Sequence, residues 1–219
     1  MNSTFLPSRR AFCLGAGAAL LGMSTTTAFA KSHEERLAEL ETYAEMYGSL
    51  PNEQFPIPAV DLSKIDPVFL RKFGDYETDE LPGTVIVNTA NRVLFLTLPE
   101  GKAIRYGVGI GRDGFSWSGR AIIHHKKAWP TWTPPAEMIE REPELEEWRN
   151  GMPPSLENPL GARALYIFQD GRDTLYRLHG TGQPETIGKA VSSGCVRLLH
   201  QDVIDLYNRV PDNTPIVVL

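Results

Sequence analysis

The chain has 219 residues, of which 42% are hydrophobic and 22% charged, as in ordinary soluble globular proteins. This composition excludes a disordered chain and a multi-pass membrane protein. The 22 Lys and Arg residues are outnumbered by 27 Asp and Glu residues, and no block of basic residues occurs, so nucleic-acid binding is not expected. The length allows one domain with an extension. Two cysteines, Cys13 and Cys195, provide no disulfide framework.

Residues 1–30 have the pattern of an export signal. Arg9 and Arg10 precede an apolar stretch at 11–23, which is shorter than the roughly 20 residues that a membrane-spanning helix needs. An Ala-Phe-Ala cleavage pattern ends the segment. The arginine pair resembles a twin-arginine signal, and a Sec signal is the alternative. We expect an exported protein without a stable transmembrane segment, whose mature form keeps Cys195 as its single thiol in an oxidising compartment.

Residues 31–80 are expected to form an N-terminal helix and linker that lean on the main domain and do not fold separately. Within 31–48, apolar residues recur at spacings of three and four between glutamates, which is typical of an amphipathic helix. Gly48 is the expected end of this helix. The segment 51–58 contains three prolines and is expected to be a linker.

Residues 81–219 change in character to short β-runs separated by turn residues. The sequence Asp-Gly at 170–171 predicts a hairpin turn. One helix is expected at 202–210, where apolar residues fall on one face and Pro211 follows. The pattern as a whole predicts a mostly-β domain with one or two helices. The expected strands are 84–87, 93–98, 103–110, 121–124, 164–168, 174–178 and 216–219.

Residues 129–160 are rich in Pro and Trp and are expected to form a long, lid-like insertion. We expect its tryptophans to be packing residues, although binding of a glycan or peptide is the alternative. Its acidic run at 140–147 predicts a solvated helix face. The neighbouring residues His124 and His125 should point to opposite faces of a strand, which makes a shared metal ion difficult.

The residues best suited to chemistry lie around Cys195. The glycine before it permits an unusual turn and close approach of a substrate. A thiol is a good nucleophile as its thiolate, and His179, at the end of an expected strand, and Arg197 are placed to lower the thiol pKa. Backbone N–H groups at 193–195 could form an oxyanion hole. The alternative is a buried structural cysteine, but a thiol without purpose would be prone to oxidation outside the cell.

These residues resemble the motif of the L,D-transpeptidase family, penicillin-insensitive cysteine enzymes that cross-link bacterial peptidoglycan. The family pattern is His-Gly-Thr/Ser and then, a dozen or so residues later, Ser-x-Gly-Cys-Val/Ile-Arg. Residues 179–181 and 192–197 match this pattern. The resemblance covers about residues 81–219. It implies a mostly-β catalytic domain of the sandwich or barrel type, with a lid-like insertion and a periplasmic location.

The resemblance also assigns roles to individual residues. It implies that Cys195 is the nucleophile and that His179 is the proton donor and acceptor. Many members carry a histidine where this chain has Ser193, so a second histidine has no counterpart here. The residues implied in oxyanion and substrate binding are Ser193, Gly194, Gly180, Thr181 and Arg197.

The implied reaction is acyl transfer from a peptidoglycan stem tetrapeptide through a thioester, with loss of D-Ala and without a metal or organic cofactor. The acceptor amine would be another stem peptide, giving a 3→3 cross-link, or a D-amino acid, or an outer-membrane protein or lipoprotein. One alternative is a hydrolase on the same scaffold: a carboxypeptidase, an endopeptidase or an amidase. Another is a non-catalytic peptidoglycan-binding module in which Cys195 is buried.

Overall fold

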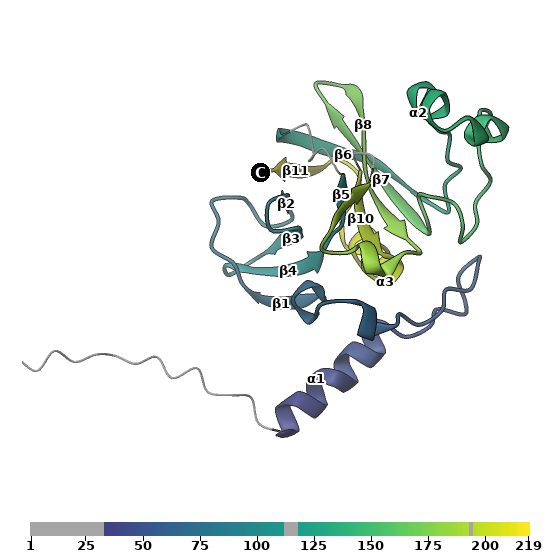
Figure 1. Ribbon diagram of the computed structural model, residues 1–219. Coiled ribbons are helices and arrows are strands. Elements are labelled where there is room, and N and C mark those ends of the chain that lie inside the picture. Colours follow the sequence, from purple (N-terminus) through teal and green to yellow (C-terminus); the bar gives the residue numbers. More distant parts are fainter. Residues whose placement is uncertain (1–32, 112–117, 193–194) are drawn as a thin grey trace, which may run out of the picture.

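The computed structural model describes residues 33–111, 118–192 and 195–219, so the predicted export signal at 1–30 lies outside the described residues. Nine strands form one curled sheet in the order β1-β4-β3-β2-β11-β6-β7-β8-β10, and β5 pairs with β9 separately (Figure 1). The strands are β1 (Lys72–Asp75), β2 (Val85–Asn88), β3 (Val93–Leu98), β4 (Lys102–Gly107), β5 (Ile110–Gly111), β6 (Gly119–Ala128), β7 (Arg163–Gln169), β8 (Arg172–Thr181), β9 (Ala190–Ser192), β10 (Val196–Leu199) and β11 (Thr214–Val218).

Helices are few and short, so the expected mostly-β architecture is confirmed. Over the described ranges, none of the helices is both long and apolar enough to cross a membrane. The α-helices are α1 (His33–Met46), α2 (Ala136–Arg141) and α3 (His200–Arg209). The 3-10 helices are η1 (Leu62–Lys64), η2 (Pro67–Phe69), η3 (Pro143–Trp148) and η4 (Pro184–Thr186).

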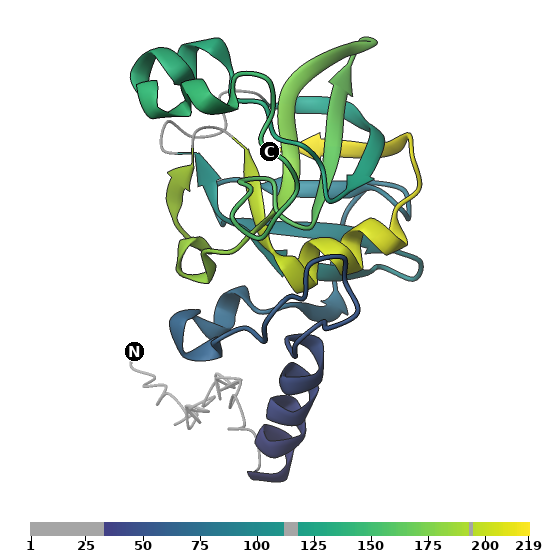
Figure 2. The ribbon, with the colours of Figure 1, turned by 90° about the vertical axis from the view of Figure 1, so that its right-hand side faces the viewer.

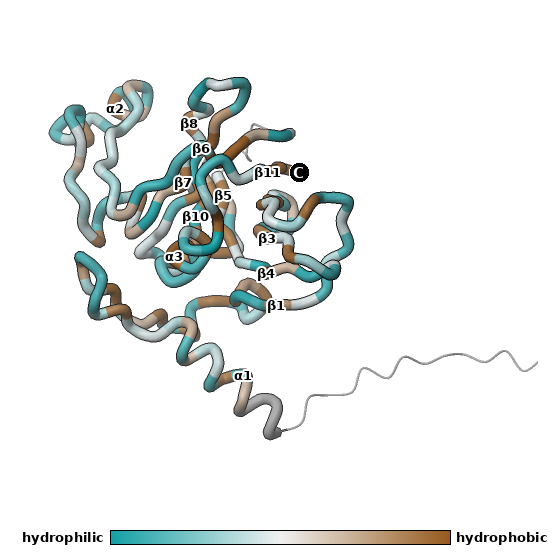
Figure 3. Tube along the Cα trace, turned by 180° about the vertical axis from the view of Figure 1, so that it is seen from behind, coloured by the Kyte–Doolittle hydropathy of each residue, from teal (hydrophilic) through white to brown (hydrophobic). Residues whose placement is uncertain are grey.

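Each of the seven strands expected from the sequence overlaps a strand of the structure. The Asp-Gly turn joins β7 to β8, and its residues Asp170 and Gly171 have φ angles of 50° and 74°, which suit a two-residue hairpin turn. This tip of the hairpin is hydrophilic (Figure 3). The run expected at 103–110 divides into β4 and β5. The sequence analysis missed β1, β9 and β10.

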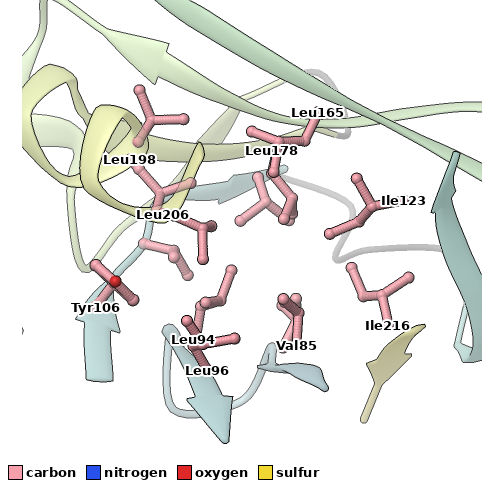
Figure 4. Packing of buried hydrophobic residues seen from close by; sticks show 14 of the residues in the cluster. Val85, Leu94, Leu96, Tyr106, Ile123, Leu165, Leu178, Leu198, Leu206 and Ile216 are labelled. Atoms are coloured by element: carbon pink, nitrogen blue, oxygen red, sulfur yellow. The ribbon is translucent and has the colours of Figure 1, made fainter. Parts of the chain in front are cut away.

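The core lies inside the curl of the sheet and is closed by α3. Apolar side chains from strands far apart in the sequence converge there, among them Leu94, Ile123, Leu178 and Ile216, with Leu206 of α3 (Figure 4). All five are fully or almost fully buried. Because each strand alternates sides, the same strands turn other side chains to the outer face of the sheet.

The N-terminal extension contributes to the main fold. β1 pairs antiparallel with β4 and forms one edge of the large sheet. α1 projects away from the sheet and reaches the body only at its C-terminal end (Figure 2). Its predicted apolar face is therefore only partly packed: Leu40 is 60% exposed, whereas Tyr47, just after the helix, is buried. Tyr47 lies in a cluster with Ile187 and Leu199, which flank the cysteine motif.

The insertion between β6 and β7 carries α2 and η3 away from the sheet (Figure 1). The expected acidic helix is divided at Glu142, since Pro143 follows, and its acidic side chains are exposed. Trp129 is buried and packs edge-on against Phe55, as expected of a packing residue. Asn158 fastens the insertion: its Nδ2 donates to three backbone carbonyls of the insertion.

The prediction that His124 and His125 point to opposite faces is wrong. One extra residue on β6 interrupts the pairing with β7 between Ile123 and His125. Such a bulge breaks the alternation of side chains, and the two Nδ1 atoms lie 3.1 Å apart. The rings stack on Phe168 and Tyr166.

Candidate active site

Two neighbouring strands at one edge of the sheet carry the predicted catalytic residues. β10 pairs in parallel with β8, with Val196 opposite Leu178 and Arg197 opposite His179. Val196 and Leu178 are fully buried in the core. Since alternate residues of a strand face opposite sides, His179 and Arg197 share the other face. Cys195 immediately precedes β10, and its sulfur is close enough to Arg197 for their charges to interact.

The environment of His179 keeps its imidazole neutral. The side chain is 4% exposed, and its Nδ1 lies 2.8 Å from the carbonyl oxygen of Gly180. A carbonyl only accepts hydrogen bonds, so Nδ1 carries the proton and Nε2 is the basic atom. Burial lowers the pKa of His179 to about 4, and the positive charge of Arg197 acts in the same direction. At neutral pH the ring is therefore uncharged, with its lone pair on Nε2.

The pKa of the Cys195 thiol is raised, whereas the sequence analysis predicts that it is lowered. Burial raises the pKa of the thiol above its ordinary value. A hydrogen bond from the backbone N–H of Arg177 and the positive charges of Arg177 and Arg197 lower the pKa, but by less. The sequence shows the cations but not the burial, which dominates here. The resting pair is therefore a neutral thiol with a neutral imidazole.

Arg197 brings an uncompensated positive charge to this face. Its Nη1 donates to Oε1 of Gln183 at 3.3 Å, and its Nε is buried without a hydrogen-bond partner among the described residues. Within the part of the chain that the structure describes, no carboxylate forms an ion pair with Arg197. Burial lowers the pKa of its guanidinium, while the charge of the Cys195 thiolate would raise it. A half-buried cation of this kind is suited to binding an anionic group.

The remaining predicted site residues have different surroundings. The carbonyl of Gly180 orients His179, and its missing side chain makes room for His200: a Cβ at Gly180 would lie 2.7 Å from His200 Nδ1. The hydroxyl of Thr181 accepts a hydrogen bond from the N–H of Gln183 at 3.1 Å. Ser193 and Gly194, the predicted oxyanion residues, lie outside the described residues.

Sequence reasoning missed two buried polar residues behind the site. His200 fits between Gly161 and Gly180, and burial lowers its pKa to about 4. Asp202, in the first turn of α3, is completely buried. It accepts a hydrogen bond from the hydroxyl of Tyr47 at 3.3 Å and lies 3.6 Å from Nε of Arg71. No local sequence signal indicates this burial, because both partners of Asp202 come from the N-terminal extension.

The extension also braces the insertion beside the site. Both carboxylate oxygens of Glu53 accept hydrogen bonds from Arg163, at 3.0 and 2.7 Å. Glu53 also accepts a hydrogen bond from the indole of Trp129 at 2.9 Å. Trp129 and Arg163 stand at the two ends of the insertion. Its last residues also act on the site, since the backbone of Pro159 raises the pKa of His179.

Residues 82–218 match the family model described as the L,D-transpeptidase catalytic domain, YkuD. The probable L,D-transpeptidase ErfK/SrfK of Escherichia coli (strain K12) is 32% identical over 216 residues, covering 93% of this chain and 65% of that protein. The probable L,D-transpeptidase YbiS of the same strain is 39% identical over 145 residues, covering 61% of this chain and 45% of that protein. The chain thus spans less than two thirds of the length of these curated relatives.

A crystal structure from Brucella melitensis, described as a probable carnitine operon oxidoreductase, is also similar. It has 43% sequence identity and a TM-score of 0.50, with 73% of this chain and 99% of that chain covered. The family model covers more than half of the chain, including both parts of the motif at 179–181 and 192–197. The chain therefore belongs to the L,D-transpeptidase family.

Proposed function

We propose that this protein transfers acyl groups from peptidoglycan stem tetrapeptides, with Cys195 as the nucleophile and His179 as the general base and acid. The observation that carries the proposal is the parallel pairing of β8 with β10, in which Arg197 lies opposite His179 and β10 begins directly after Cys195. Membership of the family supports the substrate class. The neutral state of both groups favours a mechanism in which the proton moves during attack.

In the first step, Sγ of Cys195 attacks the carbonyl that joins the third stem residue to the terminal D-Ala. Nε2 of His179 takes the thiol proton, and the carbonyl oxygen becomes a tetrahedral oxyanion. The intermediate collapses when the bond to the D-Ala nitrogen breaks, and His179 returns the proton to that leaving amine. The product is a thioester on Cys195 and free D-Ala.

In the second step, an amine attacks the thioester carbonyl while His179 removes a proton from the attacking nitrogen. Collapse breaks the bond to sulfur, which takes up a proton and leaves a new amide. The amine would come from a second stem peptide, a D-amino acid or an outer-membrane protein or lipoprotein. Water in its place would give hydrolysis. The segment 1–30 supports export of the protein to the periplasm.

Two sets of residues would stabilise charge during these steps. We assign the oxyanion to the backbone N–H groups of Ser193, Gly194 and Cys195, because backbone N–H groups are common donors in oxyanion holes. We assign a substrate carboxylate to Arg197, whose guanidinium has no acidic partner among the described residues. Stem peptides contain several carboxylates, and a bidentate arginine contact would both bind and orient one of them.

Product analysis tests the proposal. The purified protein is incubated with a tetrapeptide muropeptide, alone or with a D-amino acid, and the products are identified by mass spectrometry. We expect loss of D-Ala with either a cross-linked dimer or an exchanged tetrapeptide, and no product with Cys195→Ala or His179→Ala. Accumulation of tripeptide alone would favour the hydrolase. Turnover by folded Cys195→Ala would contradict the proposed mechanism.

A further inference from the structure

β8 is interrupted by a β-bulge close to Cys195. Between the pairs Phe168–Asp173 and Tyr166–Arg177, three residues of β8 face the single residue Ile167 of β7. A bulge of this kind breaks the ladder and redirects the backbone.

The middle residue of the bulge, Leu175, has an unfavourable backbone conformation. Its φ angle is +63°, in the left-handed region that residues with a Cβ avoid. Its side chain is 71% exposed, so burial of the leucine does not offset this cost. Strained backbone of this kind persists only where the surroundings hold it, and it occurs often at functional sites.

Two side chains of β8 hold the bulge. The hydroxyl of Thr174 donates to the carbonyl of Ile167 at 2.7 Å and accepts from the N–H of Tyr176 at 3.2 Å, replacing the missing ladder bonds. The carboxylate of Asp173 accepts from the N–H of Leu175 at 2.8 Å. The bulge is therefore built into the strand by specific contacts.

A second contact of Asp173 ties the bulge to the residue that follows it. Both carboxylate oxygens of Asp173 accept hydrogen bonds from the guanidinium of Arg177, each at 2.7 Å. The guanidinium also lies over the ring of Tyr166, 4.5 Å from its centroid. These contacts hold Arg177, so its backbone has a defined position relative to the bulge.

The bulge directs two backbone groups at the sulfur of Cys195. The thiol donates to the carbonyl of Leu175 at an Sγ–O distance of 3.9 Å. The backbone N–H of Arg177 hydrogen-bonds the thiolate and lowers the thiol pKa. The Leu175 carbonyl thus accepts a hydrogen bond from the thiol, and the Arg177 N–H donates one to the thiolate.

We propose that the bulge at 174–176 is a positioning device for Cys195, with Leu175 as its positioning residue. Its left-handed turn holds the Leu175 carbonyl at the thiol and the Arg177 N–H at the thiolate. When the thiol proton leaves for His179, the bond to the carbonyl is lost and the N–H bond to the sulfur anion remains. The sulfur therefore keeps its place while it changes charge, which favours attack on a fixed carbonyl.

Because charged groups surround Cys195, the test needs a substitution that changes no charge. The charges of Arg177 on β8 and Arg197 on β10 act on the thiol, Asp173 pairs with Arg177, and His179 is the proposed proton acceptor. A substitution at any of these residues would alter the thiol directly. Leu175→Ile changes no charge and keeps the side-chain size. Because isoleucine is β-branched, it disfavours a positive φ more strongly than leucine.

The measurement is the rate of Cys195 alkylation by iodoacetamide as a function of pH, followed by intact mass. For Leu175→Ile we expect the alkylation midpoint to rise by about one pH unit. Loss of the Arg177 N–H bond to the thiolate raises the thiol pKa, whereas loss of the thiol bond to the Leu175 carbonyl lowers it. The first effect dominates because the N–H bond is charge-assisted and therefore stronger. We expect kcat to fall about tenfold with a smaller change in KM. The separate variant Leu175→Gly should keep the wild-type midpoint, because glycine adopts the left-handed conformation without strain.

Two further variants complete the test. Leu81→Ile is the matched control, because Leu81 is 77% exposed and lies outside the bulge, and it should keep the wild-type midpoint. Thr174→Val removes the hydroxyl that replaces the ladder bonds and should raise the midpoint as Leu175→Ile does. It also carries the test if Leu175→Ile does not fold.

The proposal is overturned if folded Leu175→Ile and Thr174→Val both keep the wild-type midpoint, or if Leu175→Gly shifts it as far as Leu175→Ile. The kinetic part rests on the proposed function, whereas alkylation needs no substrate. A shifted midpoint in a protein that processes no muropeptide would therefore support the bulge and reject the function. A protein that processes the muropeptide, but whose variants keep the wild-type midpoint, would support the function and reject the bulge.

Discussion

The glycine of the His-Gly-Thr motif offers a quantitative test of how the site is built. A Cβ at Gly180 would lie 2.7 Å from Nδ1 of His200 and 3.2 Å from Cγ1 of Val203. His200 has little room to move, because a Cβ at Gly161 would lie 2.4 Å from its ring on another side. We therefore expect Gly180→Ala to reduce the free energy of unfolding by about 1–3 kcal/mol, as overpacking of a filled interior does.

The assay is urea denaturation, with Gly74→Ala as the matched control. Gly74 lies in β1, and nothing would come within 4 Å of its added Cβ, so this variant should be neutral or gain up to about 1 kcal/mol. Combining Gly180→Ala with His200→Ala provides space for the methyl group. We expect the double variant to be at least about 1 kcal/mol more stable than the sum of the single effects predicts. The packing of Gly180 against His200 would be refuted if the changes in the free energy of unfolding were additive. It would also be refuted if Gly180→Ala were as stable as Gly74→Ala.

Cys195, Asp202 and Glu53 provide three further tests. Because burial raises the pKa of the Cys195 thiol, the alkylation midpoint of the wild type should lie above the ordinary value of about 8.5; a midpoint near 6 would contradict the neutral pair. The pKa of buried Asp202 is raised from 3.8 to about 7, so its contribution to stability is full at low pH and is lost as pH rises towards 7. The stability of Asp202→Asn relative to the wild type should therefore increase between pH 4 and 7, by up to about 1.4 kcal/mol per pH unit in urea titrations; a pH-independent difference would contradict this. Glu53→Gln should cost about 1–3 kcal/mol, because it weakens the bonds to Arg163 and Trp129, and should speed amide exchange in the insertion, whereas unchanged exchange would contradict the bracing role.

The elements that sequence predicted well are those with a strong local pattern. The hairpin at 170–173 follows from its turn residues, and the strands beside it follow from their β-branched and aromatic runs. The strand at β10 was missed because it is only four residues long and passes directly into α3. β1 was missed because its sequence, Lys-Phe-Gly-Asp, is mostly exposed at a sheet edge and contains glycine.

The site shows where a single sequence stops being informative. The motif predicts Cys195, His179 and Arg197 as site residues, and the structure sets Arg197 opposite His179 on neighbouring strands, directly after Cys195. The direction of the thiol pKa could not be predicted, since it depends on burial by segments distant in the chain. The bulge at Leu175 could not be predicted either, because nothing local requires a leucine to adopt a positive φ. The same holds for Asp202, whose partners lie more than a hundred residues away.

The central claim is that Cys195 carries the acyl group. Its most direct test is an acid-quenched reaction of the purified protein with a tetrapeptide muropeptide, read by intact mass and peptide mapping. We predict a mass increase equal to the muropeptide less one molecule of free D-Ala, located on the peptide that contains Cys195 and released by hydroxylamine. An adduct on another residue, or turnover of the muropeptide by folded Cys195→Ser at the wild-type rate, would contradict the account.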